Sequence, residues 1–215
     1  EEILAFIAWQ QKQVEGYGIK VYLNHEANET LIANEAPDQV IIATGSKPRI
    51  PDLKGILKEN VFTAQELLEG TKTTGRNVLI LGGGLIGLET AHYLSGLGRT
   101  VTIIENKDVM GEDMEPAVKY FLMNELYKHE VKFIFNSEVI EITDDIVCIK
   151  GIYSEEISSL NVDTVILAVG TESNVSPFSE YLKKKTDNTI IIGDARLPRN
   201  ARFAIEEGYR AGLMI

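Results

Sequence analysis

A glycine-rich turn between a predicted strand and a predicted helix constrains the fold of this chain more than any other feature. The apolar run Val78–Leu81 predicts a buried strand, and residues 85–97 have the pattern of a helix that Gly98 can end. Between them the sequence contains Gly-x-Gly-x-x-Gly, at Gly82-Gly83-Gly84-Leu85-Ile86-Gly87. The motif alone is a weak signal, but between a strand and a helix it indicates a dinucleotide-binding unit.

Each glycine of the motif has its own task in such a unit. Gly82 permits the tight turn, Gly84 lets the backbone approach a pyrophosphate, and Gly87 allows helix and strand to pack closely. The helix that begins at Leu85 offers free N–H groups and a partial positive charge to the anion. Residues 82–87, including Gly83, Leu85 and Ile86, are therefore the predicted cofactor-binding segment. The alternative is a turn of purely structural use.

An acidic residue completes the pattern. Glu105 ends the next predicted strand, Val101–Glu105, and lies 18 residues after Gly87, close to the spacing of about 20 for a ribose-binding carboxylate. A carboxylate there accepts hydrogen bonds from the ribose 2′-OH and repels a 2′-phosphate, which favours NAD(H) over NADP(H). Lys107 weakens this preference without reversing it. Glu89, early in the helix, either approaches the nicotinamide or only caps the helix or faces solvent.

Three further apolar segments followed by glycine place this unit in a larger α/β protein. Two of them, Val40–Gly45 and Val165–Gly170, have the length and composition of a buried strand, of the kind found in parallel sheets. The third, Thr189–Ile192, predicts a strand, with a turn at Gly193-Asp194. Asp194 follows the last of them, and residues 201–213 then have a helical pattern.

This order predicts one domain, residues 75–175, inserted between two pieces of another, residues 1–74 and 176–215. Near the start, the sequence predicts a helix over residues 1–15 and a short strand at Ile19–Leu23. The remaining predicted elements are a short helix at Ala64–Glu69, a helix over residues 115–130, and strands at Phe133–Asn136, Glu138–Thr143 and Ile146–Lys150.

The four glycine-ended segments in this order resemble the pyridine-nucleotide-dependent flavoprotein oxidoreductases with two dinucleotide-binding domains. In that family a Rossmann-like NAD(P)-binding domain is inserted into a FAD-binding domain. More narrowly, Gly193-Asp194-Ala195-Arg196 with residues 204–212 resembles the C-terminal end of the NADH:flavin oxidoreductases. This group is related to old yellow enzyme and includes relatives of 2,4-dienoyl-CoA reductase and trimethylamine dehydrogenase.

The resemblance implies a partial FAD site. Asp194, after Gly193, would accept a hydrogen bond from the ribityl chain, and Thr44 and Gly45 would pass close to FAD. Gly170 ends the matching strand of the NAD(P)-binding domain and joins the predicted cofactor-binding residues. A turn aspartate and a plain strand end are the simpler alternatives for Asp194 and for Thr44–Gly45. The glycine-rich unit with which the family's FAD domain opens is not in this sequence.

The resemblance also implies a function. We expect a fragment of an NADH-dependent flavin oxidoreductase that delivers hydride to FAD and is inactive alone. Electrons would pass to an N-terminal barrel domain of the same polypeptide, with FMN and a 4Fe–4S cluster, which reduces an unsaturated substrate. The chain begins at Glu1 and ends at Ile215 within a helical pattern, which also predicts a fragment. The alternatives are a non-catalytic adenine-nucleotide-binding module and part of a shorter NADH oxidase or ferredoxin reductase.

Composition narrows the classes of partner and cofactor. The net charge of -11 argues against nucleic acid and anionic lipid as partners. No apolar run approaches the ~20 residues of a membrane span. Cys148 is the single cysteine, so the sequence excludes a dithiol redox pair. This low cysteine content is consistent with a cytoplasmic location. The three histidines lack metal-ligand spacing, so we predict no metal site, and no side chain is assigned to catalysis.

Overall fold

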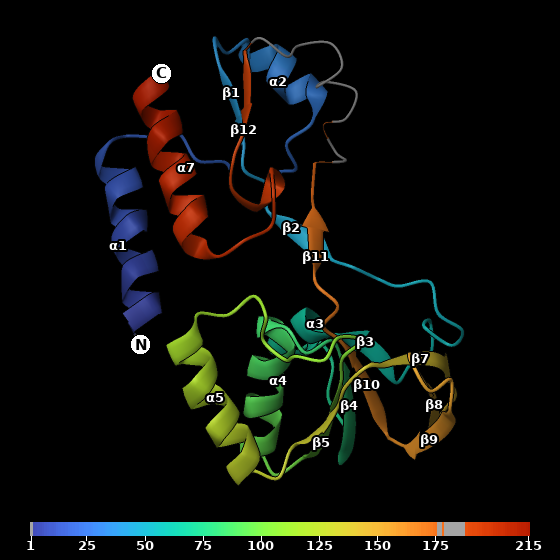
Figure 1. Ribbon diagram of the computed structural model, residues 1–215. Helices are drawn as coiled ribbons and strands as arrows, with labels where there is room; N and C mark the ends of the chain where they lie inside the picture. The colour runs from blue at the N-terminus through green and yellow to red at the C-terminus, as the bar shows by residue number, and fades with distance from the viewer. Residues whose placement is uncertain (1, 176–177, 179–187) are drawn as a thin grey trace. The chain divides into compact units, whose positions relative to one another are not determined.

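The computed structural model describes residues 2–175, 178 and 188–215 (Figure 1). The chain divides into two compact units. One is Glu1–Val40 with Ser176–Thr189, and the other is Ile41–Val175 with Ile190–Ile215. In the described part of the chain, no helix is both long and apolar enough to cross a bilayer.

The first unit contains helices α1 (Glu2–Gly16) and α2 (Glu29–Glu35). Helix α1 confirms the prediction for residues 1–15. Helix α2 was not predicted; Asn28 caps it by accepting a hydrogen bond from the backbone N–H of Leu31 at 3.0 Å. The predicted strand Ile19–Leu23 is wrong, because this segment has no strand structure and its alternating apolar side chains are exposed.

A five-stranded parallel sheet forms the centre of the second unit. In spatial order its strands are β3 (Val61–Thr63), β10 (Thr164–Leu167), β4 (Asn77–Leu81), β5 (Thr100–Ile104) and β6 (Lys132–Ile134). The chain runs outward from β4 through β5 to β6 and then returns to the other side of β4 as β10. The strand order therefore reverses between β4 and β10. Strand β3 comes from residues before 75.

Different elements cover the two faces of this sheet (Figure 1). Helices α3 (Ala64–Leu68), α4 (Leu85–Gly96) and α5 (Pro116–Lys128) pack on one face. The other face carries an antiparallel sheet of β7 (Ser137–Ile142), β8 (Ile146–Gly151) and β9 (Ile157–Asn161). The predicted helices and strands of this region are confirmed within a few residues, whereas β3 and β9 were not predicted.

Burial on both faces explains why the sequence of strand β4 is apolar at nearly every position. Val78 and Ile80 belong to the hydrophobic cluster on the helical side, whereas Leu79 and Leu81 belong to the cluster beneath β7–β9. All four are at most 7% exposed. Because successive side chains of a strand alternate between faces, a strand covered on both faces needs apolar residues at every position.

The remaining elements of the second unit are short, apart from the last helix. They are β1 (Val40–Ile42), which pairs with β12 (Thr189–Ile191), β2 (Ser46–Pro48), which pairs with β11 (Thr171–Ser173), the 3-10 turn η2 (Gly193–Ala195) and α7 (Ala201–Met214). The prediction of a fully buried strand at Val40–Gly45 is wrong in part. Only Ile42 of β1 is buried, and Ile41 is 38% exposed, because among the described strands β1 has one neighbour rather than a covered sheet.

Candidate functional site

A pocket of about 520 Å³ lies at the carboxyl ends of β4, β5 and β10. This is the place where the strand order reverses, and open α/β sheets bind ligands at such points. The volume is within the usual range for small-molecule sites. The predicted site residues that line it are Gly82, Gly83, Gly84, Leu85, Ile86, Glu105 and Gly170.

Two glycines of the turn are required by close backbone approaches. Gly82 has φ +101°, and a Cβ there would lie 2.4 Å from the carbonyl oxygen of Ala168. A Cβ at Gly87 would lie 1.9 Å from the carbonyl oxygen of Gly82. A side chain at either position would therefore push α4 or β10 away from the turn. Gly87 acts in this packing and is not among the described residues that line the pocket.

The N-terminus of α4 opens into the pocket, and an acidic side chain caps it. Gly84 is the N-cap residue and has no side chain with which to cap the helix. Instead, the backbone N–H of Leu85 donates to the carboxylate of Asp113, at 3.0 Å from Oδ1 and 3.2 Å from Oδ2. A Cβ at Gly84 would lie 3.2 Å from the same carboxylate, so the backbone and Asp113 are in close contact.

Glu105 also bonds to the turn. Its Oε2 accepts from the N–H of Gly83 at 2.7 Å, and its Oε1 accepts from the N–H of Lys107 at 3.1 Å. The predicted ribose-binding carboxylate therefore lies at the glycine turn, as its position after β5 requires. The N–H groups of Gly83 and Leu85 are thus held by two carboxylates, one directly after β5 and one from the loop that follows.

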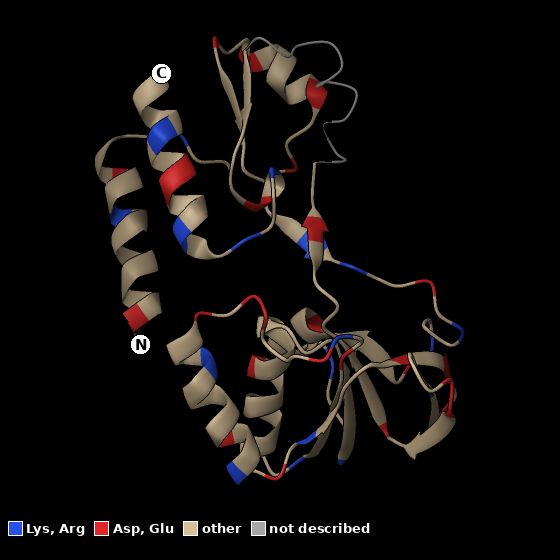
Figure 2. Ribbon diagram, in the orientation of Figure 1, with Lys and Arg blue, Asp and Glu red and all other residues tan. Residues whose placement is uncertain are grey.

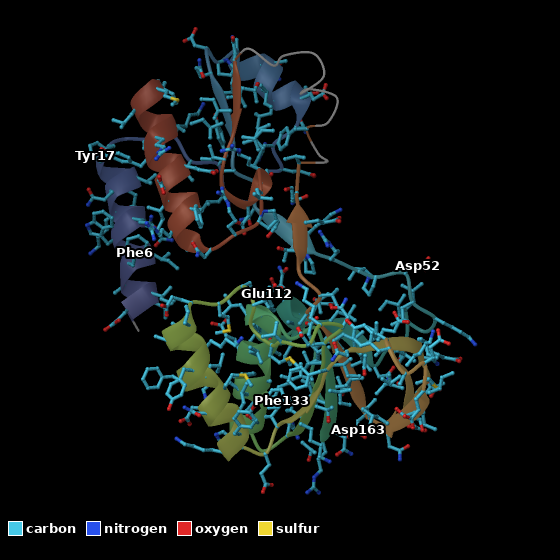
Figure 3. All side chains as sticks on the ribbon, in the orientation of Figure 1. Phe6, Tyr17, Asp52, Glu112, Phe133 and Asp163 are labelled. Atoms are coloured by element: carbon cyan, nitrogen blue, oxygen red, sulfur yellow. The ribbon has the colours of Figure 1, made fainter. Side chains whose placement is uncertain are left out.

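That loop, residues 106–115, is anchored over the turn. The side chain of Met110 is 2% exposed, and the N–H of Gly111 donates to the carbonyl oxygen of Gly83 at 2.7 Å. Figure 2 shows acidic residues along the loop, and Figure 3 labels Glu112 on it. Glu112 forms an exposed ion pair with Lys107. This contact raises the pKa of the Lys107 ammonium and lowers the pKa of the Glu112 carboxyl.

Sequence reasoning missed Asp113, Met110 and Glu112 as residues of this site. The acidic pair Glu112-Asp113 before Pro116 is a weak signal, because sequence alone does not tell how a loop folds back. For Glu89 the sequence left two alternatives open, an approach to the nicotinamide or a position that caps the helix or faces solvent. The side chain of Glu89 is exposed on α4 and is not among the described residues lining the pocket.

The residues of the predicted FAD site form a second cluster. The carbonyl oxygen of Gly45 accepts from the N–H of Asn174 at 3.0 Å, and Thr44 Oγ1 donates to the carbonyl oxygen of Asn174. Ser46 Oγ then donates to Asp194 Oδ2 at 3.3 Å. Segments 44–46 and 193–195, about 150 residues apart in the chain, are therefore brought together.

The turn at Gly193 is fixed by α7. The N–H of Gly193 donates to Glu207 Oε2 at 2.8 Å, and Glu207 also pairs with Arg196 and Arg199. Hydrogen bonds from Arg199 and from the Gly193 N–H lower the pKa of the Glu207 carboxyl. The N–H of Arg199 donates to Asp194 Oδ1 at 3.1 Å, so both oxygens of Asp194 have a donor.

The parallel sheet, the glycine turn and the pocket at the reversal of strand order define a dinucleotide-binding protein of the α/β class. The chain matches the pyridine nucleotide-disulphide oxidoreductase family over residues 10–200, and it belongs to that family. The resemblance expected from the sequence is confirmed.

The relatives are longer oxidoreductases. The chain is 32% identical over 98% of its length to an NADH oxidase of Thermoanaerobacter brockii, and 30% identical over 95% to a cinnamate reductase of Clostridium sporogenes. It covers 33% and 30% of those two proteins. A structure of 2-naphthoyl-CoA reductase with 2-naphthoyl-CoA superimposes with a TM-score of 0.88 at 31% identity, over 95% of this chain and 31% of that one.

The chain therefore spans about a third of the length of these relatives. What the match over residues 10–200 shows is the FAD- and NAD(P)H-binding part that defines the pyridine nucleotide-disulphide oxidoreductase family.

Proposed function

We propose that the chain binds NAD(H), in preference to NADP(H), in the pocket at the glycine turn. The observation that carries this proposal is the hydrogen bond between Glu105 and Gly83, because it holds a carboxylate beside the turn that approaches a pyrophosphate. The adenosine ribose of a nucleotide bound on the turn would meet that carboxylate.

The pocket fits the pyrophosphate of a dinucleotide. The N–H of Leu85 lies at the first turn of α4, a helix of 12 residues whose N-terminus lines the pocket. Such a terminus combines free donors with the positive end of the helix dipole. The donor is accessible to an acidic group, since Asp113 already reaches it.

The charges around the pocket favour NAD(H). Glu105, Glu112 and Asp113 line it, and all three are acidic. Lys107, which also lines it, is paired with Glu112 rather than free to meet a phosphate. A 2′-phosphate would therefore face a surplus of negative charge, whereas a 2′-OH can donate to Glu105.

We place NAD(P) binding in residues 75–175 and the later part of a FAD site in residues 1–74 and 176–215. Asp194 fits a role in binding FAD, because each of its oxygens accepts one described hydrogen bond and keeps a further lone pair for a ribityl hydroxyl. Ser46 and Arg199 orient that carboxylate. When bound, NADH would supply a hydride and FAD would accept it; the chain's own residues hold and orient both nucleotides.

The whole protein would be an NADH-dependent reductase of an unsaturated substrate. The remaining two thirds of relatives such as the cinnamate reductase leave room for an N-terminal barrel domain with FMN and an iron–sulfur cluster. This coverage favours the longer class over a short ferredoxin reductase. A non-catalytic nucleotide module would share the pyrophosphate and ribose contacts but would not need a nicotinamide position.

Calorimetric titration of the chain with NADH, NADPH, ADP and FAD tests the proposal. We expect NADH to bind at least about tenfold more tightly than NADPH, the equivalent of about 1.4 kcal/mol. NADH binding no tighter than ADP binding would favour the non-catalytic module. Equal binding of NADH and NADPH would remove the role given to Glu105.

A further inference from the structure

Asp113 occupies the place where the proposed function puts a phosphate group. Its two oxygens lie 3.0 and 3.2 Å from the backbone nitrogen of Leu85, the first residue of α4. The contact joins residues 28 positions apart in the chain, so it depends on how the loop folds and not on local sequence. The same carboxylate lines the pocket.

We infer that the Asp113 carboxylate occupies the pyrophosphate position in the nucleotide-free protein, and that a nucleotide must displace this carboxylate from the N–H of Leu85 in order to bind. This inference rests on the proposed binding of NAD(H) at the glycine turn. Asp113 thereby sets the affinity of the site, because each nucleotide competes with a carboxylate that is tethered next to the same N–H.

Geometry and charge both prevent the Asp113 carboxylate and a phosphate group from binding the N–H of Leu85 at the same time. One backbone N–H makes one good hydrogen bond, so a phosphate oxygen on Leu85 leaves Asp113 without this donor. Two negative groups at one helix N-terminus also repel each other. The helix dipole stabilises a negative charge only within the first turn of the helix. A phosphate that approaches Gly84 meets the Asp113 carboxylate, which lies 3.2 Å from where a Cβ on that glycine would be.

The loop keeps Asp113 close to the N–H of Leu85 but leaves its side chain free to rotate. Met110 is buried and Gly111 is bonded to Gly83, so the loop is anchored before Asp113, and α5 begins after it at Pro116. Asp113 itself is exposed. Rotation of its side chain is enough to release Leu85, and the anchored parts of the loop can stay in place.

Removal of the Asp113 carboxylate therefore has two opposite effects. The free chain loses a helix cap and becomes less stable, whereas nucleotide affinity increases because the competitor is gone. A residue with a merely structural role would lower stability without raising affinity. Low salt should enlarge the gain, since the repulsion between Asp113 and the pyrophosphate is screened by added salt.

The test compares NADH affinity in the wild-type chain, Asp113→Ala, Asp113→Asn and Asp108→Asn. Asp108 is exposed on the same loop, so its substitution removes the same charge without changing the contact with Leu85. We expect NADH to bind about three- to tenfold more tightly to both Asp113 variants, more so for Ala, because Asn can still accept one hydrogen bond. Urea unfolding should show both to be less stable than wild type.

The outcomes separate the inference about Asp113 from the proposed binding of NAD(H). Unchanged or weaker NADH binding to Asp113→Asn, with wild type binding normally, overturns this inference and leaves the proposed function in place. An equal gain in Asp108→Asn also overturns it, since the effect would then be one of overall charge. Failure of every variant and of wild type to bind NADH overturns the proposed function and this inference with it. If Asp113→Ala does not fold, Asp113→Asn carries the comparison.

Discussion

Glu105 Oε2 lies 2.7 Å from the backbone nitrogen of Gly83 and accepts its hydrogen bond, although the two residues are 22 positions apart. The contact ties the end of β5 to the turn after β4. It has a consequence for recognition, because the carboxylate proposed to bind the ribose is already oriented by the turn that is proposed to bind the pyrophosphate.

Replacing Glu105 with Arg should therefore exchange the nucleotide preference. We expect NADH to bind at least about tenfold more weakly, since the acceptor for the 2′-OH is lost, and NADPH to bind more tightly because a guanidinium pairs with phosphate. Parallel titrations with NADH and NADPH measure both effects. Glu59→Arg, at an exposed position away from the pocket, is the control for added positive charge. Unchanged NADH affinity in Glu105→Arg would contradict the assignment.

Glu112 should limit NADPH binding through Lys107. In Glu112→Gln the ammonium of Lys107 loses its partner, and one negative charge leaves the pocket lining. We expect NADPH affinity to increase about two- to fivefold, and NADH affinity to change less than about twofold, because exposed ion pairs are worth at most about 1 kcal/mol. The double variant Lys107→Ala, Glu112→Gln should lose the part of the gain that Lys107 provides. A gain that persists in full would assign the effect to Glu112 alone.

Gly87 and Gly96 lie on the same helix and should respond oppositely to alanine. A Cβ at Gly87 would collide with the backbone oxygen of Gly82, so Gly87→Ala should lower the free energy of unfolding by about 1–3 kcal/mol. Gly96 ends α4, and a Cβ there meets nothing within 4 Å among the described residues. Gly96→Ala should therefore be neutral or stabilise by up to about 1 kcal/mol. Urea unfolding of the two variants gives the comparison, and equal losses would refute the packing argument.

The sequence predicts the glycine turn and Glu105 well because both are determined locally. The turn is flanked by a strand and a helix with strong patterns, and Glu105 follows the next strand at a fixed spacing. Strand β4 was predictable for a related reason, since burial on both faces demands a continuous apolar run. These features need no knowledge of contacts far apart in the chain.

Other parts of the structure depend on tertiary contacts or on weak patterns. Asp113 joins the site only because its loop folds back and Met110 is buried. Strand β9 escaped prediction because most of its residues are exposed and lack an apolar alternation. The reverse error occurred at Ile19–Leu23, where alternating apolar residues form no strand. Alternation predicts a strand only where a sheet is available to receive it.

The start of α3 offers a test of stability against pH. Thr63 and Glu66 form a reciprocal cap: Glu66 Oε2 accepts from the N–H and hydroxyl of Thr63, each at 2.8 Å, and the N–H of Glu66 donates to Thr63 Oγ1 at 3.2 Å. These hydrogen bonds to the charged form hold the pKa of the Glu66 carboxyl below its usual value of 4.5. A carboxyl with a lowered pKa in the folded state stabilises the protein above its unfolded pKa. That stabilisation is lost as pH falls through the folded pKa.

Glu66→Gln keeps a side chain that can accept one hydrogen bond from Thr63 but removes the titrating group. At pH 7 we expect the variant to be less stable than wild type by about 1 kcal/mol, because bonds to a charged acceptor are stronger. The difference should shrink as the pH is lowered below 4.5 and through the lowered pKa of Glu66 in the folded protein, where the wild-type carboxyl becomes protonated. Urea unfolding across this range measures it, with Glu59→Gln as an exposed control of equal charge change. A difference between wild type and Glu66→Gln that stays constant through that pKa would show that the charge on Glu66 does not strengthen the cap.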